Sequence, residues 1–274
     1  MTAAANNIFN KAVHPERERA LSPQIQKGIN IGTWDYVKEL LANRVYHCFE
    51  VVQLGCEWVG KGLGLAGSAL SPIYTGLGKL VATENIVFFA SDLLTFPAQI
   101  KKLSGKVREW KEGNVTAGAV NNQARKVFAH VASTVSDYAG SCRALVELGV
   151  KLGSFDFIKE KFAHVAGSFS ALSGIYDYCT DSEEAPANKL GVDDKKPFME
   201  SKRLWGLAKN VSILGLSVLA LSFGGIAALP GAVVLSLSSA ILVSRMFGYY
   251  RELQVQAIDK VLIADQLNKG KIKQ

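Results

Sequence analysis

Charged residues are scarce in this chain of 274 residues, at 20%, and apolar residues reach 49%. Globular domains usually carry about a quarter of charged residues. The net charge of +7 is unevenly placed, because the residues from Ser201 onwards carry nine Lys or Arg against three acids. Basic residues beside an apolar segment suit anionic lipid headgroups better than nucleic acid, which requires a basic face along its backbone. We therefore expect a lipid bilayer as partner and no nucleic acid.

Motifs that carry chemistry are missing as well. The four cysteines form no CxxC pair, and no His stands at zinc-finger spacing from them. No GxSxG, HExxH, EF-hand loop or P-loop occurs, and the adjacent acids at 183–184 and 193–194 suit a solvated segment better than an acid/base pair. A GxGxxG begins at Gly62, but a helix rather than a strand is expected before it, which disfavours a dinucleotide site. The sequence predicts no enzyme, no metal site and no cofactor.

The beginning of the chain lacks an apolar stretch of signal-peptide length, so we do not expect cleavage by the ordinary secretory route. Residues 1–32 are polar and contain Pro15 and Pro23. We interpret them as a mobile N-terminal arm with at most one short helix. Unpaired cysteines suit a reducing compartment, which agrees with a chain that does not follow the ordinary secretory route.

Residues 33–180 are predicted to form a helical domain, because apolar residues recur every three or four positions from Thr33 onwards. One helix is expected to end or kink before Pro97. Two later stretches follow strict heptad spacing and are separated by Gly153-Ser154. So short a connection predicts an antiparallel pair of helices, 124–152 and 155–179.

The pentapeptide FAHVA occurs once in each of these helices, at Phe128–Ala132 and at Phe162–Ala166. In both copies Phe and Val fall on the a and d positions of the heptad, so we interpret the repeat as a packing seam. His130 and His164 fall at position c, away from the seam. We therefore expect both histidines to face solvent and to be dispensable for stability.

Residues 181–200 contain Pro186 and Pro197 and are interpreted as a linker. Beyond them, residues 201–274 hold a run without charge from Val211 to Ser244, 34 residues long. One span needs only about 20 residues. The middle of the run is rich in turn-forming residues: Gly224, Gly225, Pro230 and Gly231. They predict a hairpin with legs from Leu204 to Phe223 and from Leu229 to Tyr249, followed by a helix with a basic end.

The flanks of this hairpin match a membrane protein. Five basic residues stand at its open end: Lys202, Arg203, Lys209, Arg245 and Arg251. The turn carries no charge, and this asymmetry places both termini in the cytosol. An aromatic belt is expected at Trp205, Tyr249 and Tyr250. A stripe of small residues, Ser236, Ala240 and Ser244, would allow tight contact between helices in lipid.

The predicted fold is therefore all-α, an amphipathic helical bundle followed by a C-terminal hydrophobic helical hairpin of two transmembrane helices. Two apolar lobes around a short Gly/Pro turn, VSILGLSVLALSFGG and LPGAVVLSLSSAILVS, resemble the chlamydial inclusion membrane (Inc) proteins. That resemblance implies a type III secreted protein in the membrane of a pathogen-containing vacuole. It also implies that the cytosolic parts recruit host protein partners.

Two other interpretations remain open. Residues 84–103, ENIVFFASDLLTFPAQIKKL, are faintly similar to a helix of membrane-shaping proteins of the peroxin-11 type, which combine amphipathic helices with a late apolar segment. The other alternative is a soluble all-α binding module in which the hairpin is buried. The identity of a protein partner and the formation of a homo-oligomer are also open.

Overall fold

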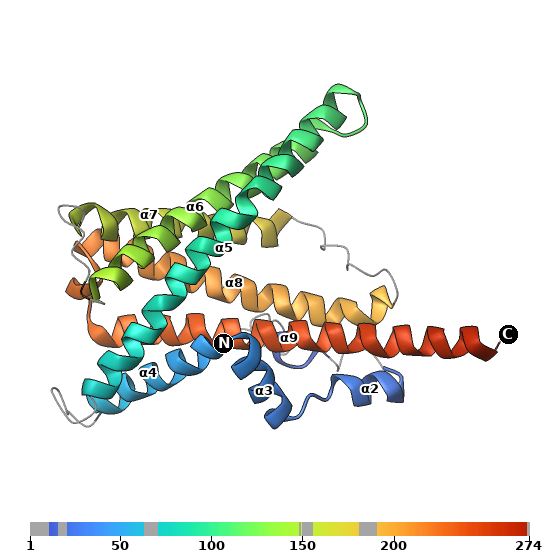
Figure 1. Ribbon diagram of the computed structural model, residues 1–274, viewed down its shortest axis with the longest axis horizontal. Coiled ribbons are helices and arrows are strands. Elements are labelled where there is room, and N and C mark those ends of the chain that lie inside the picture. The colour runs from blue at the N-terminus through green and yellow to red at the C-terminus, as the bar shows by residue number, and fades with distance from the viewer. Residues whose placement is uncertain are drawn as a thin grey trace. The chain divides into compact units, whose positions relative to one another are not determined.

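The computed structural model describes residues 11–15, 21–62, 71–147, 149, 156–180 and 191–272. Within these ranges the regular structure is helical and no strand occurs, so the predicted all-α fold is confirmed (Figure 1). The bounds of the elements are α2 (Pro23–Ile29), α3 (Thr33–Asn43), α4 (Val45–Gly62), α5 (Ser71–Lys111), α6 (Ala117–Glu147), α7 (Asp156–Thr180), α8 (Val192–Phe223), the 3-10 helix η3 (Ile226–Ala228) and α9 (Gly231–Ile272).

The chain divides into two compact units. Unit 1 comprises Met1–Val45, Tyr176–Lys209 and Ala240–Gln274, and unit 2 comprises Tyr46–Ile175 and Asn210–Ser239. Helices α8 and α9 contribute to both. The domain boundaries that the sequence predicts differ from the bounds of these two units, and they stay a prediction.

Unit 1 has a core built from three distant segments. Leu21, Ile25 and Ile29 are buried against Phe198 of α8 and Ile258 of α9. Pro23 occupies the first turn of α2, where its missing N–H is not needed, and the Ser22 hydroxyl accepts a hydrogen bond from the Ile25 N–H at 3.3 Å. This part of the segment interpreted as a mobile arm is therefore packed, because its apolar residues face α8 and α9.

Helix α8 begins at Val192, earlier than the sequence indicated, so residues 192–200 are helical rather than linker; residues 181–190 lie outside the described residues. Asp193 and Asp194 stand in the first turn, where negative charge is favourable. Pro197 removes one backbone hydrogen bond. Burial of Phe198 and an ion pair of 2.5 Å from the buried Lys195 to Asp259 offset that loss.

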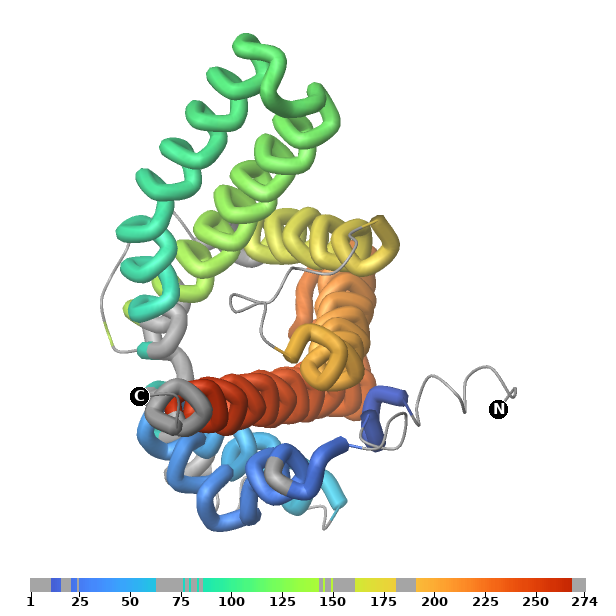
Figure 2. Tube along the Cα trace, turned by 90° about the vertical axis from the view of Figure 1, so that its right-hand side faces the viewer, coloured from blue at the N-terminus to red at the C-terminus, as the bar shows by residue number. Residues whose placement is uncertain are grey.

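Helices α5 and α6 of unit 2 pair closely (Figures 1 and 2), and α5 runs through Pro97 instead of ending before it. The Thr95 hydroxyl donates to the carbonyls of Ser91 and Asp92, each at 3.1 Å, in the turn that the proline disturbs. His130 of α6 bonds the same Asp92 carbonyl at 3.1 Å. These contacts hold the turn before Pro97 and join it to α6. Packing against α6 therefore outweighs the local preference of proline.

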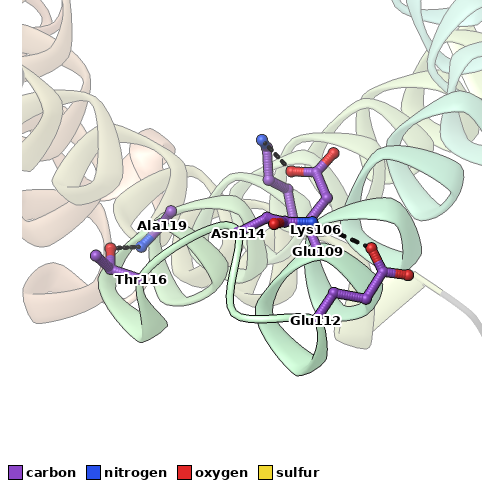
Figure 3. A network of polar contacts seen from close by, with 6 residues as sticks. All are labelled: Lys106, Glu109, Glu112, Asn114, Thr116 and Ala119. Atoms are coloured by element: carbon purple, nitrogen blue, oxygen red, sulfur yellow. Dashed lines mark hydrogen bonds and ion pairs between the residues drawn. The ribbon is translucent and has the colours of Figure 1, made fainter.

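The turn between α5 and α6 is closed by polar contacts (Figure 3). Lys106 pairs with Glu109 at 2.7 Å, and the Asn114 side chain donates to Glu112 at 3.2 Å. Gly113 has a φ of +78°, a conformation that residues with a Cβ rarely adopt. Thr116 then caps α6, since its hydroxyl accepts from the Ala119 N–H at 3.3 Å. The pair therefore ends in a charged tip.

Helices α6 and α7 meet in an antiparallel arrangement. Arg125 donates to the Ser173 hydroxyl at 3.1 Å, and the rings of Phe128 and Phe169 meet edge to face with centroids 5.8 Å apart. The expected seam, however, is wrong in its face, because most of its described large residues are exposed: Phe128, Val131, Val135, Tyr138, Phe162, Val165, Phe169, Leu172 and Tyr176. Most buried apolar positions carry small residues, which let helix axes approach closely: Ala132, Ala139, Cys142, Ala166 and Ala171. Val127 of α6 is a larger residue that is also buried.

The expectation that both histidines face solvent is also wrong. The His130 ring is partly buried, stacks on Phe96 at an interplanar angle of 10° and bonds the Asp92 carbonyl. His164 is partly buried too. Both histidines lie away from the stripe of large residues that includes Phe128 and Phe162, as the heptad assignment implies. Because most large residues of that stripe are exposed, position c points toward the protein instead.

Candidate membrane hairpin

The hairpin is formed by α8, η3 and α9, and its turn lies where the sequence placed it. Helix α8 ends at Phe223, and Gly224 and Gly225 follow with φ values of +85° and +137°, which favour glycine. The Gly225 N–H returns to the Ala220 carbonyl at 2.7 Å, a bond typical of a glycine-terminated helix. At the other side the Pro230 carbonyl accepts from the Val233 N–H at 2.9 Å, so proline stands directly before α9.

The two legs contact each other within each unit. In unit 1, Trp205 of α8 stacks on Phe247 of α9 with ring centroids 4.7 Å apart and planes inclined by 16°. In unit 2, a Cβ added at Gly215 would lie 4.0 Å from Leu237. Residues later in α8 face residues earlier in α9, as an antiparallel hairpin requires. Ala220 and Leu235 are fully buried in unit 2.

Most of the hairpin surface is apolar and exposed. Both α8 and α9 are long and apolar enough to cross a membrane. Only 11% of the most apolar stretch of α8, and 17% of that of α9, is buried inside the protein. Val211, Val218 and Phe223 of α8 and Val243 of α9 are exposed. In a soluble protein these side chains would leave apolar surface exposed to water, which is typical of sites that contact membranes or partners.

Aromatic rings gather at the open end of the hairpin, where the belt was expected. Besides the stacked Trp205 and Phe247, Tyr36 of α3 meets Tyr250 edge to face at 5.3 Å and lies 6.4 Å from the Tyr249 ring. The Tyr36 hydroxyl donates to the Met246 carbonyl at 2.7 Å. Rings with polar tips are the side chains that membrane interfaces favour. Sequence reasoning missed Tyr36, which lies about 200 residues from its partners.

The basic flank residues differ in what they contact. Lys202 is half-exposed and pairs with Glu252 at 3.2 Å. Arg203 donates to the Tyr178 carbonyl at 3.1 Å and lies over the Tyr178 ring. Lys209 and Arg245 are partly buried and close enough to repel each other. These four remain candidates for headgroup contact, with Lys202 the most accessible.

Arg251 departs from the expectation, because it is only 4% exposed and cannot serve as a surface flank. Its guanidinium donates to the Ser201 hydroxyl at 3.1 Å and to the Gln254 side chain at 2.5 Å. It also donates to the carbonyls of Ala12 and Val13. Arg251 thus links both legs of the hairpin to the N-terminal segment. The sequence around Arg251 does not indicate these distant partners.

The expected stripe of small residues is only partly inside. Ser244 is buried, whereas Ser236 and Ala240 are exposed, because the face of α9 that meets the protein carries Leu235 and Leu242 instead. The close approach between helices occurs elsewhere, between α7 and α8. A Cβ added at Gly167 would lie 3.4 Å from the Ser217 hydroxyl, and one added at Gly174 would overlap the Asn210 side chain. The two glycines are seven residues apart in the sequence, and so are their two partners on α8.

The described residues also bear on chemistry. Among them, no group of three or more His, Cys, Asp or Glu is placed to hold a metal. Burial raises the pKa of the Cys48 thiol, which lowers its thiolate fraction at neutral pH. Gly64 and Gly67 of the GxGxxG motif lie outside the described residues.

No protein-family model matches this chain, and neither does any curated protein or solved structure. Its function is therefore argued from the hairpin itself. The hairpin offers an apolar surface with an aromatic and basic open end, which is a surface suited to lipid.

Proposed function

We propose that this chain is a non-enzymatic integral membrane protein anchored by the hairpin of α8 and α9. The observation that carries the proposal is the exposure of the two apolar helices, of which 11% and 17% are buried in their most apolar stretches. A hairpin that formed the core of a soluble binding module would be mostly buried. Exposed apolar helices are unfavourable in water by about 25 cal/mol per Å² and are stable in lipid.

Both termini are proposed to lie in the cytosol. Unit 1 contains residues that precede the first leg, residues that follow the second, and the N-terminal segment held by Arg251. Lys195 and Phe198 before the first leg contact Asp259 and Ile258 after the second, which supports placing both flanks on the same side of the membrane. Leu204–Phe223 comprises 20 residues, or about 30 Å of helix, which matches the hydrocarbon core of a bilayer. The surface cation Lys202 then stands at the headgroups, as the positive-inside rule favours.

The role proposed for the helical part is recruitment of protein partners or organisation of a vacuole or organelle membrane, as in the Inc proteins. Helix α5 supports it by presenting Leu94, Ile100 and Trp110 to the outside between charged residues. Large apolar side chains with a charged surround are typical of surfaces that bind partners. Type III secretion and a host vacuole are what the resemblance to the Inc proteins implies, and they belong to this proposal.

A membrane-shaping role of the peroxin-11 type is a second candidate. It is favoured by the exposed apolar residues on the amphipathic helices before the hairpin, which include Trp34 and Leu41 on α3 and Trp58 on α4. Helices that expose aromatic residues on one face insert into the headgroup region and favour curvature. Tubulation of vesicles by the full chain distinguishes this role from recruitment alone.

Extraction of cell membranes with alkaline carbonate and with high salt tests the anchor. We expect the full chain to stay in the membrane pellet under both treatments and to dissolve only in detergent, because a hairpin is embedded in acyl chains rather than held by charge. Release by salt indicates a peripheral protein. Recovery in the soluble fraction without any treatment supports the soluble binding module and contradicts the proposal.

A further inference from the structure

On helix α7 the large apolar residues face outward and the small residues face the protein, the reverse of the usual arrangement in water. Its large residues form one exposed stripe at spacings of three and four: Phe162, Val165, Phe169, Leu172 and Tyr176. The residues that face the protein are small, among them Ala166, Gly167 and Ala171. A helix in water buries its large apolar side chains. Small residues inside and large residues outside are typical of helices packed together in lipid.

Helix α7 also lies against the first leg of the hairpin (Figures 1 and 2). Gly174 meets Asn210, and Gly167 meets Ser217 one heptad further along the leg. The two helices are therefore antiparallel and share the same depth over about 10 Å. Continuing this pairing residue by residue puts Tyr176 level with Ala208 and Phe162 level with Ser222.

Charged residues are absent from nearly the same range of depth on α7 and on the first leg. No Asp, Glu, Lys or Arg occurs on α7 from Phe162 to Tyr176, and Lys161 and Asp177 bound this stretch. On the leg, Lys209 is the last charge before the turn at Gly224. The uncharged parts of α7 and of the leg are thus nearly coextensive. Independent helices have no reason to match in this way, whereas helices that cross one apolar layer do.

We propose that α7 is a third lipid-embedded helix, whose outer stripe from Phe162 to Tyr176 contacts acyl chains of the bilayer that holds the hairpin. This inference rests on the proposed membrane anchor, because α7 takes its depth from the first leg. Tyr176 and the neighbouring Tyr178 stand at the level of the aromatic and basic open end, where tyrosine is favoured.

Nitroxide accessibility in the full chain tests this assignment. The native cysteines are replaced by Ala, and one nitroxide is attached to the variants Val165→Cys, Val218→Cys or Leu267→Cys. All three parent residues are exposed, on α7, on the hairpin leg and on the far end of α9. The protein is reconstituted in vesicles of phosphatidylcholine and phosphatidylglycerol. Collision rates are then measured with oxygen, which concentrates in acyl chains, and with a water-soluble nickel chelate.

We expect the ratio of oxygen to nickel accessibility at position 165 to equal or exceed that at 218, and both to exceed that at 267. If 218 is in lipid while 165 is in water, α7 is not embedded and the hairpin proposal stands. If both are in water, the anchor itself is absent and the inference falls with it. Spin coupling between copies at 165, with low access to both reagents, shows that a second copy covers the stripe and overturns the inference.

Discussion

Replacement of Val218 by arginine is expected to remove the protein from the membrane fraction. Val218 lies on the first leg and is 49% exposed, so the longer side chain meets no steric obstacle within the protein. Arginine near the centre of a membrane helix costs about 2.5–3.5 kcal/mol on insertion scales. That cost lowers partition into the bilayer on the order of a hundredfold. The same replacement on a water-exposed surface changes stability by about 0.5 kcal/mol at most.

Leu267→Arg is the matched control. Leu267 is 62% exposed and belongs to the last turns of α9, beyond the uncharged run. We expect this variant to remain in the membrane pellet like the parent chain, with no loss of helix content. Equal membrane fractions for Val218→Arg and Leu267→Arg would show that Val218 lies in water and that the leg is not embedded.

Replacement of Arg251 by methionine is expected to destabilise the open end of the hairpin by roughly 3 kcal/mol. The change removes the Arg251 donor from the Val13 carbonyl and from the side chains of Ser201 and Gln254, whereas the Ala12 carbonyl still accepts from Ser201 and Trp205. A buried polar group that loses its partner costs about 1–3 kcal/mol, and several groups are affected together. Unfolding by denaturant in detergent micelles, followed by circular dichroism, measures the difference.

Lys202→Met provides the comparison, because Lys202 is also a basic flank residue but is 49% exposed in its ion pair with Glu252. Surface ion pairs contribute less than about 1 kcal/mol. This variant should keep its stability and bind less tightly to vesicles that contain phosphatidylglycerol. If Arg251→Met behaves in the same way, Arg251 faces headgroups, as its sequence position first indicated.

The turn of the hairpin could be predicted because it depends on local chemistry. Gly224 and Gly225 adopt positive φ values that other residues avoid, and Pro230 cannot continue a helix from the preceding residues. The uncharged run is also longer than the roughly 20 residues that one membrane span needs. Neither inference needs knowledge of what the legs contact, so both ends of the turn were placed correctly.

Prolines within helices misled the sequence analysis for the opposite reason. Local propensity predicts breaks at Pro97 and Pro197, yet α5 and α8 continue through them. Their cost is offset by distant residues, His130 at the first site and Ile258 at the second. Local propensity is outweighed by tertiary packing, which one stretch of sequence does not reveal.

The heptad pattern of α6 and α7 gave the period but not the buried face. Phe128 and Phe162 were assigned to a seam on the rule that large apolar residues lie inside. That rule presumes water outside. The small residues that are buried in fact, such as Ala132 and Ala166, occupy their own periodic stripe and were visible in the repeat. Which of two apolar helix faces is buried depends on whether water or lipid surrounds the helix. The exposed hairpin raises the same question.

Labelling of single cysteines in sealed vesicles tests the central claim, a hairpin in the membrane with both ends on one side. The positions are the exposed Cys179 before the first leg, Leu267→Cys after the second and Ala227→Cys in the turn. An impermeant maleimide should label 179 and 267 equally from one side, and reach 227 from that side only after detergent opens the vesicles. Labelling of 179 without 267 would mean a single span, and labelling of all three in intact vesicles would contradict insertion of the hairpin.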